Sequence, residues 1–309
     1  MRCLFLLILF LISSCAGEKN SENKPVIGLD GRVFSAPELN TKTKARLDSN
    51  LAIAQNNFDE ERSEENYIWL GRRQAYLSEY SKAIKTFSEG IDKFPESYML
   101  FRHRGHRYIT TREFFKALAD LQQAAALMPQ SLEIEEDGQP NKLNKPLSNT
   151  QFNVWYHLGL AHYLKGDFES ASKAYAECLK VSDNDDLICA TADWLYMTYQ
   201  KIGMKEEAQK ILDSTPADTM NIIENDSYYL RLKMYKGLVL PDDLLKESTE
   251  NDDADLALAT QGYGVGNWYL AKGDTTRAVE IFRQVVNGKN FAAFGFIASE
   301  AELQRLLKH

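Results

Sequence analysis

Residues 155–179 read WYHLGLAHYLKGDFESASKAYAECL, and this stretch has the pattern of two helices joined by a short turn. Apolar side chains recur at helical spacing in both halves. The small residues Gly159 and Ala171 would let the two helices approach closely, while the large side chains of Trp155 and Tyr175 would fill the space beside them. Because such a pair cannot bury its apolar face alone, the stretch predicts an array in which each pair packs on the next.

The same pattern returns along the chain with a period of 34 residues. This spacing separates Gly71 from Gly105, Ala83 from Ala117, Tyr80 from Phe114 and Pro95 from Pro129. Later copies include Leu195, Tyr199, Gly203, Ala208 and Leu212, then a degenerate copy with Gly237 and Pro241, then Val265, Gly266, Tyr269, Gly273, Ala278 and Phe282. Gly159 follows Gly105 by 54 residues, so an insertion over residues 132–151 separates the second copy from the third.

The period and the residue types resemble the tetratricopeptide repeat (TPR), whose first helix carries W-x2-L-G-x2-Y and whose second carries A-x3-F before a closing proline. The resemblance implies an all-α fold: a right-handed α-solenoid of about five to six helix pairs over residues 45–309. The last segment, FAAFGFIASEAELQRLLKH (residues 291–309), is expected to form a C-terminal capping helix over the last repeat. The first helix of each pair would line a concave groove.

The N-terminus, MRCLFLLILFLISSCAG, has the features of an export signal: one cation, an apolar run and small residues. The ISSC sequence that ends at Cys15 resembles the bacterial lipobox, which implies removal of residues 1–14 and lipidation of Cys15, including a palmitate-type acyl chain. Residues 15–44 are polar and interrupted by proline and glycine, which predicts a flexible tether. We therefore expect a lipid-anchored protein of the bacterial cell envelope, located at the outer membrane on either its periplasmic or its surface face.

Charge and cysteine content exclude two broad classes. The chain has 309 residues and a net charge of −8, which argues against a general nucleic-acid binder. With Cys3 removed and Cys15 lipidated, Cys178 and Cys189 remain, too few for a disulfide framework. An exported chain could pair them, but buried free thiols are the favoured interpretation.

The repeat register places several polar side chains on the groove. Arg72, Arg102 and His106 could hold a carboxylate or another anion, although salt-bridged surface arginines would give the same pattern. Flat contact surfaces for a peptide or a sugar would come from four tyrosines, some of which ordinary repeat packing explains: Tyr76, Tyr156, Tyr163 and Tyr263. The same register places Asp193 and Asn267 in the groove. His103, Arg107 and Arg112 are assigned to outer or inter-repeat surfaces.

Arg104 stands where the repeat expects leucine, as at Leu70 and Leu158. A partly buried arginine needs a carboxylate partner, and the acidic start of the insertion, which includes Glu133, Glu135, Glu136 and Asp137, could supply one. The insertion could also fold over the groove, or it could be a tolerated surface loop.

No sequence feature predicts a metal, a cofactor or an enzyme. The histidines lack a set of companion ligands at metal-site spacing, and GYGVG (residues 262–266) lacks the rest of a dinucleotide fingerprint. The preferred function is a membrane-anchored adaptor that binds a protein partner, such as a cell-wall enzyme, through its groove. The alternative is a binding module for a glycan, a peptidoglycan fragment or an acidic peptide.

Overall fold

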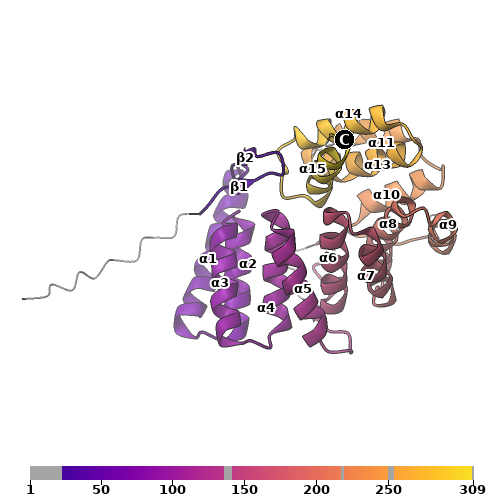
Figure 1. The fold of residues 1–309 in the computed structure, drawn as a ribbon. Helices are drawn as coiled ribbons and strands as arrows, with labels where there is room; N and C mark the ends of the chain where they lie inside the picture. The colour runs from indigo at the N-terminus through magenta and orange to yellow at the C-terminus, as the bar shows by residue number, and fades with distance from the viewer. Residues whose placement is uncertain (1–22, 136–140, 217–218, 250–253, 308–309) are drawn as a thin grey trace, which may run out of the picture.

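Consecutive helices of the chain pack in pairs (Figure 1), so the predicted all-α solenoid is confirmed. The computed structural model describes residues 23–135, 141–216, 219–249 and 254–307. Its helices are α1 (Thr41–Glu60), α2 (Glu64–Tyr76), α3 (Tyr80–Lys93), α4 (Tyr98–Thr110), α5 (Phe114–Leu127), α6 (Thr150–Lys165), α7 (Phe168–Lys180), α8 (Asp185–Lys201), α9 (Lys205–Ser214), α10 (Asp226–Tyr235), α11 (Pro241–Thr249), α12 (Ala254–Ala257), α13 (Tyr263–Ala271), α14 (Thr275–Val286) and α15 (Phe294–Leu307). A π-helical turn, Leu258–Gly262, joins α12 to α13.

The repeat glycines set the spacing within each pair. A Cβ atom added to Gly71 in α2 would lie 2.4 Å from the ring of Phe87 in α3, and one added to Gly159 in α6 would lie 2.8 Å from Tyr175 in α7. Both distances are far below a van der Waals contact, so these positions require glycine. The close approach buries Phe87 and Tyr175, each at most 1% exposed.

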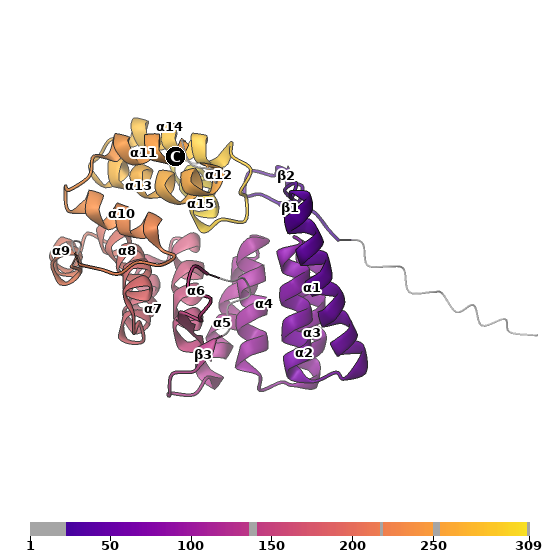
Figure 2. The same ribbon diagram turned by 180° about the vertical axis from the view of Figure 1, so that it is seen from behind.

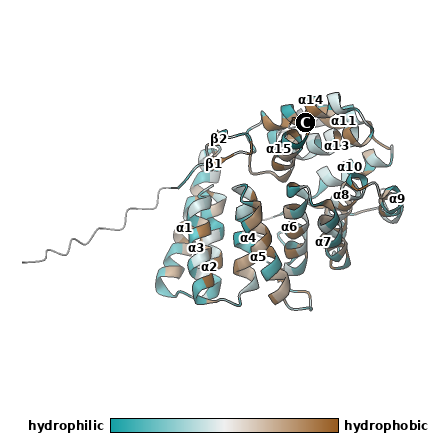
Figure 3. Ribbon diagram, in the orientation of Figure 1, coloured by the Kyte–Doolittle hydropathy of each residue, from teal (hydrophilic) through white to brown (hydrophobic). Residues whose placement is uncertain are grey.

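Helix α1 closes the N-terminal end of the stack. It is mostly hydrophilic, whereas α5, which is covered by a neighbour on each side, is hydrophobic along much of its length (Figure 3). The inner face of α1 still contributes Leu47, Ala54 and Phe58 to the core. A polar outer face on a terminal helix keeps the end of a solenoid soluble.

The C-terminal helices do not simply prolong the row. They turn back and lie across the ends of α4 and α6 (Figures 1 and 2). The hydroxyl of Tyr263 in α13 lies 2.6 Å from that of Tyr163 in α6, and Arg112, just after α4, forms an ion pair with Glu300 in α15 at 2.7 Å. Helix α15 also contacts α6, the first helix of the third repeat, in addition to α14, the helix of the last repeat that it was expected to cover.

The predicted tether is too long. Residues 1–22, which include the signal and Cys15, lie outside the described residues, but strand β1 (Val26–Ile27) pairs with β2 (Val33–Phe34) in an antiparallel hairpin. The ring of Phe34 stacks on Phe291 with 5.0 Å between centroids, and Val26 is 5% exposed. The apolar contacts of Val26 and of the partly buried Phe34 explain why this segment packs on the C-terminal helices instead of leading freely to α1.

The insertion is also ordered at its base. Strand β3 (Ile134–Glu135) pairs with β4 (Ser148–Asn149), and residues 136–140, which include Glu136 and Asp137, lie outside the described residues. The side chains of β3 alternate, so that Ile134 is 79% exposed and Glu135 is 4% exposed. The insertion thus turns a carboxylate inward, toward α4.

Candidate functional site

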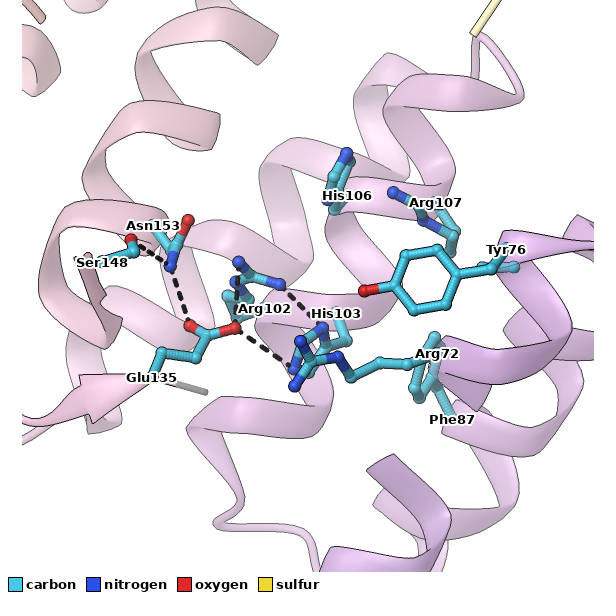
Figure 4. Close-up of a pocket in the computed structure, with 11 residues that line it drawn as sticks. Arg72, Tyr76, Phe87, Arg102, His103, His106, Arg107, Glu135, Ser148 and Asn153 are labelled. Atoms are coloured by element: carbon cyan, nitrogen blue, oxygen red, sulfur yellow. Dashed lines mark hydrogen bonds and ion pairs between the residues drawn. The ribbon is translucent and has the colours of Figure 1, made fainter. Parts of the chain in front are cut away.

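A cavity of about 210 Å³ lies between α2, α4 and the insertion. Arginines, histidines and one carboxylate dominate its walls (Figure 4). The lining residues are Arg72, Ala75, Tyr76, Phe87, Arg102, His103, His106, Arg107, Glu135, Ser148 and Asn153.

One face of α4 supplies four of the polar side chains, more than any other element. The residues at 102, 103, 106 and 107 are spaced i, i+1, i+4 and i+5, which places them side by side on a helix. Ser97 caps the start of the helix, and its hydroxyl accepts a hydrogen bond from the backbone N–H of Leu100 at 3.1 Å. The structure thus brings His103 and Arg107 into the cavity, although the sequence register had assigned them elsewhere. Their i+4 spacing was the signal that could have found them.

Arg102 is held by a carboxylate from the insertion. Its Nη2 lies 3.1 Å from Oε1 of Glu135, and the amide of Asn153 donates to Oε2 of the same carboxylate at 2.9 Å. Arg102 is 7% exposed and Glu135 is 4% exposed, so the pair is largely removed from water. The Nε of Arg102 is buried and has no hydrogen-bond partner among the described residues, so the guanidinium keeps an unused donor.

His103 is a neutral part of this arrangement. Its Nδ1 accepts a hydrogen bond from Nη1 of Arg102 at 2.7 Å, so the ring proton belongs on Nε2, which lies 3.6 Å from Glu135. The ring stacks on Phe87, with 5.7 Å between centroids. Burial, and then the charge of Arg102, hold the pKa of His103 well below its usual value.

His106 is partly buried and lies against a neighbouring repeat. Its ring centroid is 4.2 Å from that of His157 in α6 and 5.4 Å from that of Phe294 in α15. Burial also holds the pKa of both histidines well below the usual value. The ring of His106 therefore presents an uncharged surface to the cavity, with His157 and Phe294 packed behind it.

Arg107 and Arg72 add two more guanidinium groups. Arg107 lies over the ring of Tyr80 at 5.6 Å and forms no ion pair with a carboxylate among the described residues. Arg72, 9% exposed, lies over the ring of Trp69 at 4.4 Å. The hydroxyl of Tyr76 points toward Arg102 and His103 (Figure 4). The walls thus offer several N–H donors and, within the described residues, a single carboxylate.

Comparison with known proteins supports the repeat assignment. Residues 152–185 match the family model described as Tetratricopeptide repeat. The chain thus carries at least one tetratricopeptide repeat. The structure of a tetratricopeptide repeat protein from Parabacteroides merdae has a TM-score of 0.50 at 15% identity, and the match covers 84% of this chain and 94% of that chain.

Two further solved structures are similar to the chain at lower TM-scores. YrrB, described as a TPR protein with an unusual peptide-binding site, is 14% identical over 81% of this chain and 97% of its own, with a TM-score of 0.42. MamA AMB-1 is 16% identical over 56% of this chain and 89% of its own, also with a TM-score of 0.42. No curated protein matches the sequence of the chain.

The structure brings together some of the residues that the TPR register placed in the groove and separates others. Arg72, Tyr76, Arg102 and His106 all line the cavity. The remaining predicted residues lie in the core away from it, each at most 5% exposed: Tyr156, Tyr163, Asp193, Tyr263 and Asn267. The register assumed a continuing superhelix, whereas the C-terminal helices turn back and cover these side chains.

The partner of Arg104 differs from the one expected. Its Nε and Nη2 donate to the two carboxylate oxygens of Asp120 in α5, at 2.7 Å and 2.8 Å. The acidic insertion pairs with Arg102 through Glu135, and Glu133 accepts a hydrogen bond from the hydroxyl of Tyr98. The prediction that Arg104 needs a carboxylate is correct, but the second helix of its own TPR unit supplies it.

Three structural features bear on other classes of function. Among residues 23–135, 141–216, 219–249 and 254–307, no group of three histidine, cysteine, aspartate or glutamate side chains could hold a metal ion. Cys178 and Cys189 are both free and buried, as predicted. None of the helices in the described part of the chain is long and apolar enough to cross a membrane.

Proposed function

We propose that this TPR protein is a lipid-anchored adaptor of the bacterial cell envelope that binds a protein partner through the cavity between α2, α4 and the insertion. The observation that carries the proposal is the guanidinium of Arg107, which lines the cavity and forms no ion pair with a carboxylate among the described residues. Guanidinium groups bind carboxylates and other anions with directed hydrogen bonds. An acidic segment of a partner protein fits this chemistry.

The lipid anchor rests on the sequence before the described residues. The apolar run and the ISSC sequence at residues 12–15 support lipidation of Cys15. Mass spectrometry of the protein extracted from membranes tests it directly, since the mature chain should begin at an acylated Cys15. A Cys15→Ser variant that stays in the membrane fraction would contradict the anchor.

The adaptor function predicts a partner that depends on the cavity. Detergent-solubilised membranes are passed over the immobilised protein and over its Arg107→Ala variant. We expect a specific partner to be captured by the wild type and lost by the variant, because the variant removes the guanidinium that has no internal carboxylate. Arg277→Ala is the matched control, since Arg277 is a surface arginine paired with Asp242 and Glu280. Capture that is equal on all three proteins would exclude the cavity as the binding site.

A second candidate is a binding module for a small anionic ligand, such as a peptidoglycan fragment, a charged glycan or a free acidic peptide. The size of the cavity, about 210 Å³, favours it, because that volume fits a single acidic group with its immediate neighbours. Thermal unfolding in the presence of each ligand distinguishes the two functions. A rise in the unfolding temperature that disappears in Arg107→Ala would favour the small ligand.

The proposed role is binding and not catalysis. Ser148 is the serine among the lining residues, and its Oγ lies 2.8 Å from the amide of Asn153, which cannot act as a base.

A further inference from the structure

The carboxylate of Glu135 occupies the position at Arg102 that an acidic ligand would take. Its Oε1 lies 3.1 Å from Nη2 of Arg102 and 3.6 Å from Nε2 of His103. Figure 4 shows the carboxylate entering the cavity from the side of the insertion, opposite Tyr76 and Arg72. The chain therefore presents to Arg102 the same group that the proposed partner would present.

The local structure gives Glu135 no packing reason to be buried. Strand β3 has two residues, and its other side chain, Ile134, is 79% exposed although it is apolar. Burying a carboxylate costs free energy unless partners compensate its charge. If hydrophobic packing decided the orientation of the strand, the apolar side chain of Ile134 would point inward instead. The hairpin has the opposite arrangement, and its inward residue is held by Asn153 and Arg102. The insertion is thus arranged to deliver a charge to the cavity.

Two carboxylates cannot share this cavity without cost. A ligand carboxylate at Arg102 would lie close to that of Glu135, and like charges at short range repel each other. Either Glu135 leaves Arg102 when the ligand arrives, or the ligand binds despite repulsion by the charge of Glu135. Both routes make Glu135 lower the affinity for an acidic ligand.

We propose that Glu135 is an internal competitor that sets the affinity of the cavity for acidic side chains of a partner, by occupying Arg102 until a ligand carboxylate replaces it. This inference rests on the proposed function, because it assumes that the cavity receives an anionic group. It adds the class of ligand, an aspartate or glutamate side chain of an extended segment, and the residue that controls its binding.

The test uses the full-length, detergent-solubilised protein and a short polyglutamate peptide. Titration calorimetry compares wild type with Glu135→Gln, which removes the charge and keeps a hydrogen-bonding side chain of the same size. We expect Glu135→Gln to bind the peptide about tenfold more tightly or better, the scale of a close charge repulsion. Glu133→Gln is the matched control: Glu133 lies on the same insertion with the same charge, but it is bonded to Tyr98 and does not line the cavity. It should bind like the wild type.

A second variant guards against loss of folding. If Glu135→Gln unfolds, Asn153→Ala keeps every charge and removes the amide that holds Oε2 of Glu135, so it should bind the peptide more tightly than the wild type. Equal or weaker binding by a folded Glu135→Gln or Asn153→Ala protein would overturn the inference. If that happens while partner capture still depends on Arg107, the competitor role fails and the proposed function stands. If no protein binds polyglutamate and no capture depends on Arg107, both fail.

Discussion

The guanidinium of Arg231 lies 2.6 Å from the carboxylate of Asp193, and neither side chain is exposed to solvent. Arg231, in α10, also donates to the backbone carbonyl of Thr260 in the π-helical turn at 3.1 Å. Asp193 lies in α8. The ion pair therefore joins three segments at the point where the solenoid turns back on itself.

Asp193→Asn should destabilise the protein strongly. The substitution leaves the buried guanidinium of Arg231 without a compensating charge, which costs about 3–5 kcal/mol in the free energy of unfolding. Chemical denaturation followed by circular dichroism measures the loss. Asp243→Asn is the matched control, because Asp243 is a surface residue 3.8 Å from Lys246, and it should change the free energy of unfolding by no more than about 0.5 kcal/mol. Similar losses for both substitutions would contradict a structural role for the buried pair.

The pair between Arg104 and Asp120 makes a prediction that depends on both residues. Arg104→Leu supplies the side chain that the repeat pattern expects, yet it leaves the largely buried carboxylate of Asp120 unpaired. We expect a loss of about 2–3 kcal/mol, less than for a fully buried pair because Arg104 is partly exposed.

The double variant Arg104→Leu/Asp120→Leu should recover most of that loss, since two apolar side chains replace the pair. Denaturation of the two single variants and the double variant gives the coupling free energy between the residues. Losses that simply add would show that the two side chains do not act together.

The sequence predicts the repeat units well because each depends on contacts within about 34 residues. The spacing of Gly71 and Gly105 finds the close helix contacts, and these positions do pack against Phe87 and Leu121. The path of the chain as a whole depends on contacts between distant segments. The bond between Tyr163 and Tyr263 spans 100 residues, and no local pattern encodes it.

The same distinction explains what the sequence predicts of the candidate site. Arg102 and His106 follow from the helix register, so their position in the cavity is predictable. The entry of Glu135 is not, because the insertion interrupts the repeat and its hairpin register is fixed by two residue pairs alone. Asp193 was assigned to the groove by the same register, yet its pairing with Arg231 in a later repeat places it in the core.

The two buried cysteines should resist modification in the folded protein. Burial raises the pKa of the Cys178 thiol to about 12, and burial also raises that of Cys189. The thiolate is the reactive form, so a thiol reagent at mildly alkaline pH should label neither residue until denaturant is added. A cysteine introduced by Ile53→Cys, at a position that is 56% exposed, should react at once and shows that the reagent is active. Rapid labelling of Cys178 or Cys189 without denaturant would contradict the buried positions.

The cluster of neutral histidines predicts a loss of stability in mild acid. Burial is the largest cause that lowers the pKa of His103, His106 and His157 in the folded protein, so these rings stay neutral below the pH at which the unfolded chain takes up protons. As the pH falls below about 6.5, the unfolded state therefore binds more protons, and the free energy of unfolding decreases. Each of these histidines contributes up to about 1.4 kcal/mol per pH unit until its folded pKa is reached.

The substitution His106→Phe measures the contribution of one histidine to this loss of stability in acid. The ring of His106 packs against those of His157 and Phe294, so a phenyl ring can occupy the same place without a titrating group. Urea denaturation of wild type and variant is compared between about pH 5 and 6.5. The free energy of unfolding should fall less steeply with pH in the variant, because the variant takes up as much as one proton fewer on unfolding. Identical slopes would mean that His106 titrates alike in the folded and unfolded chains, in conflict with its buried position between α4, α6 and α15.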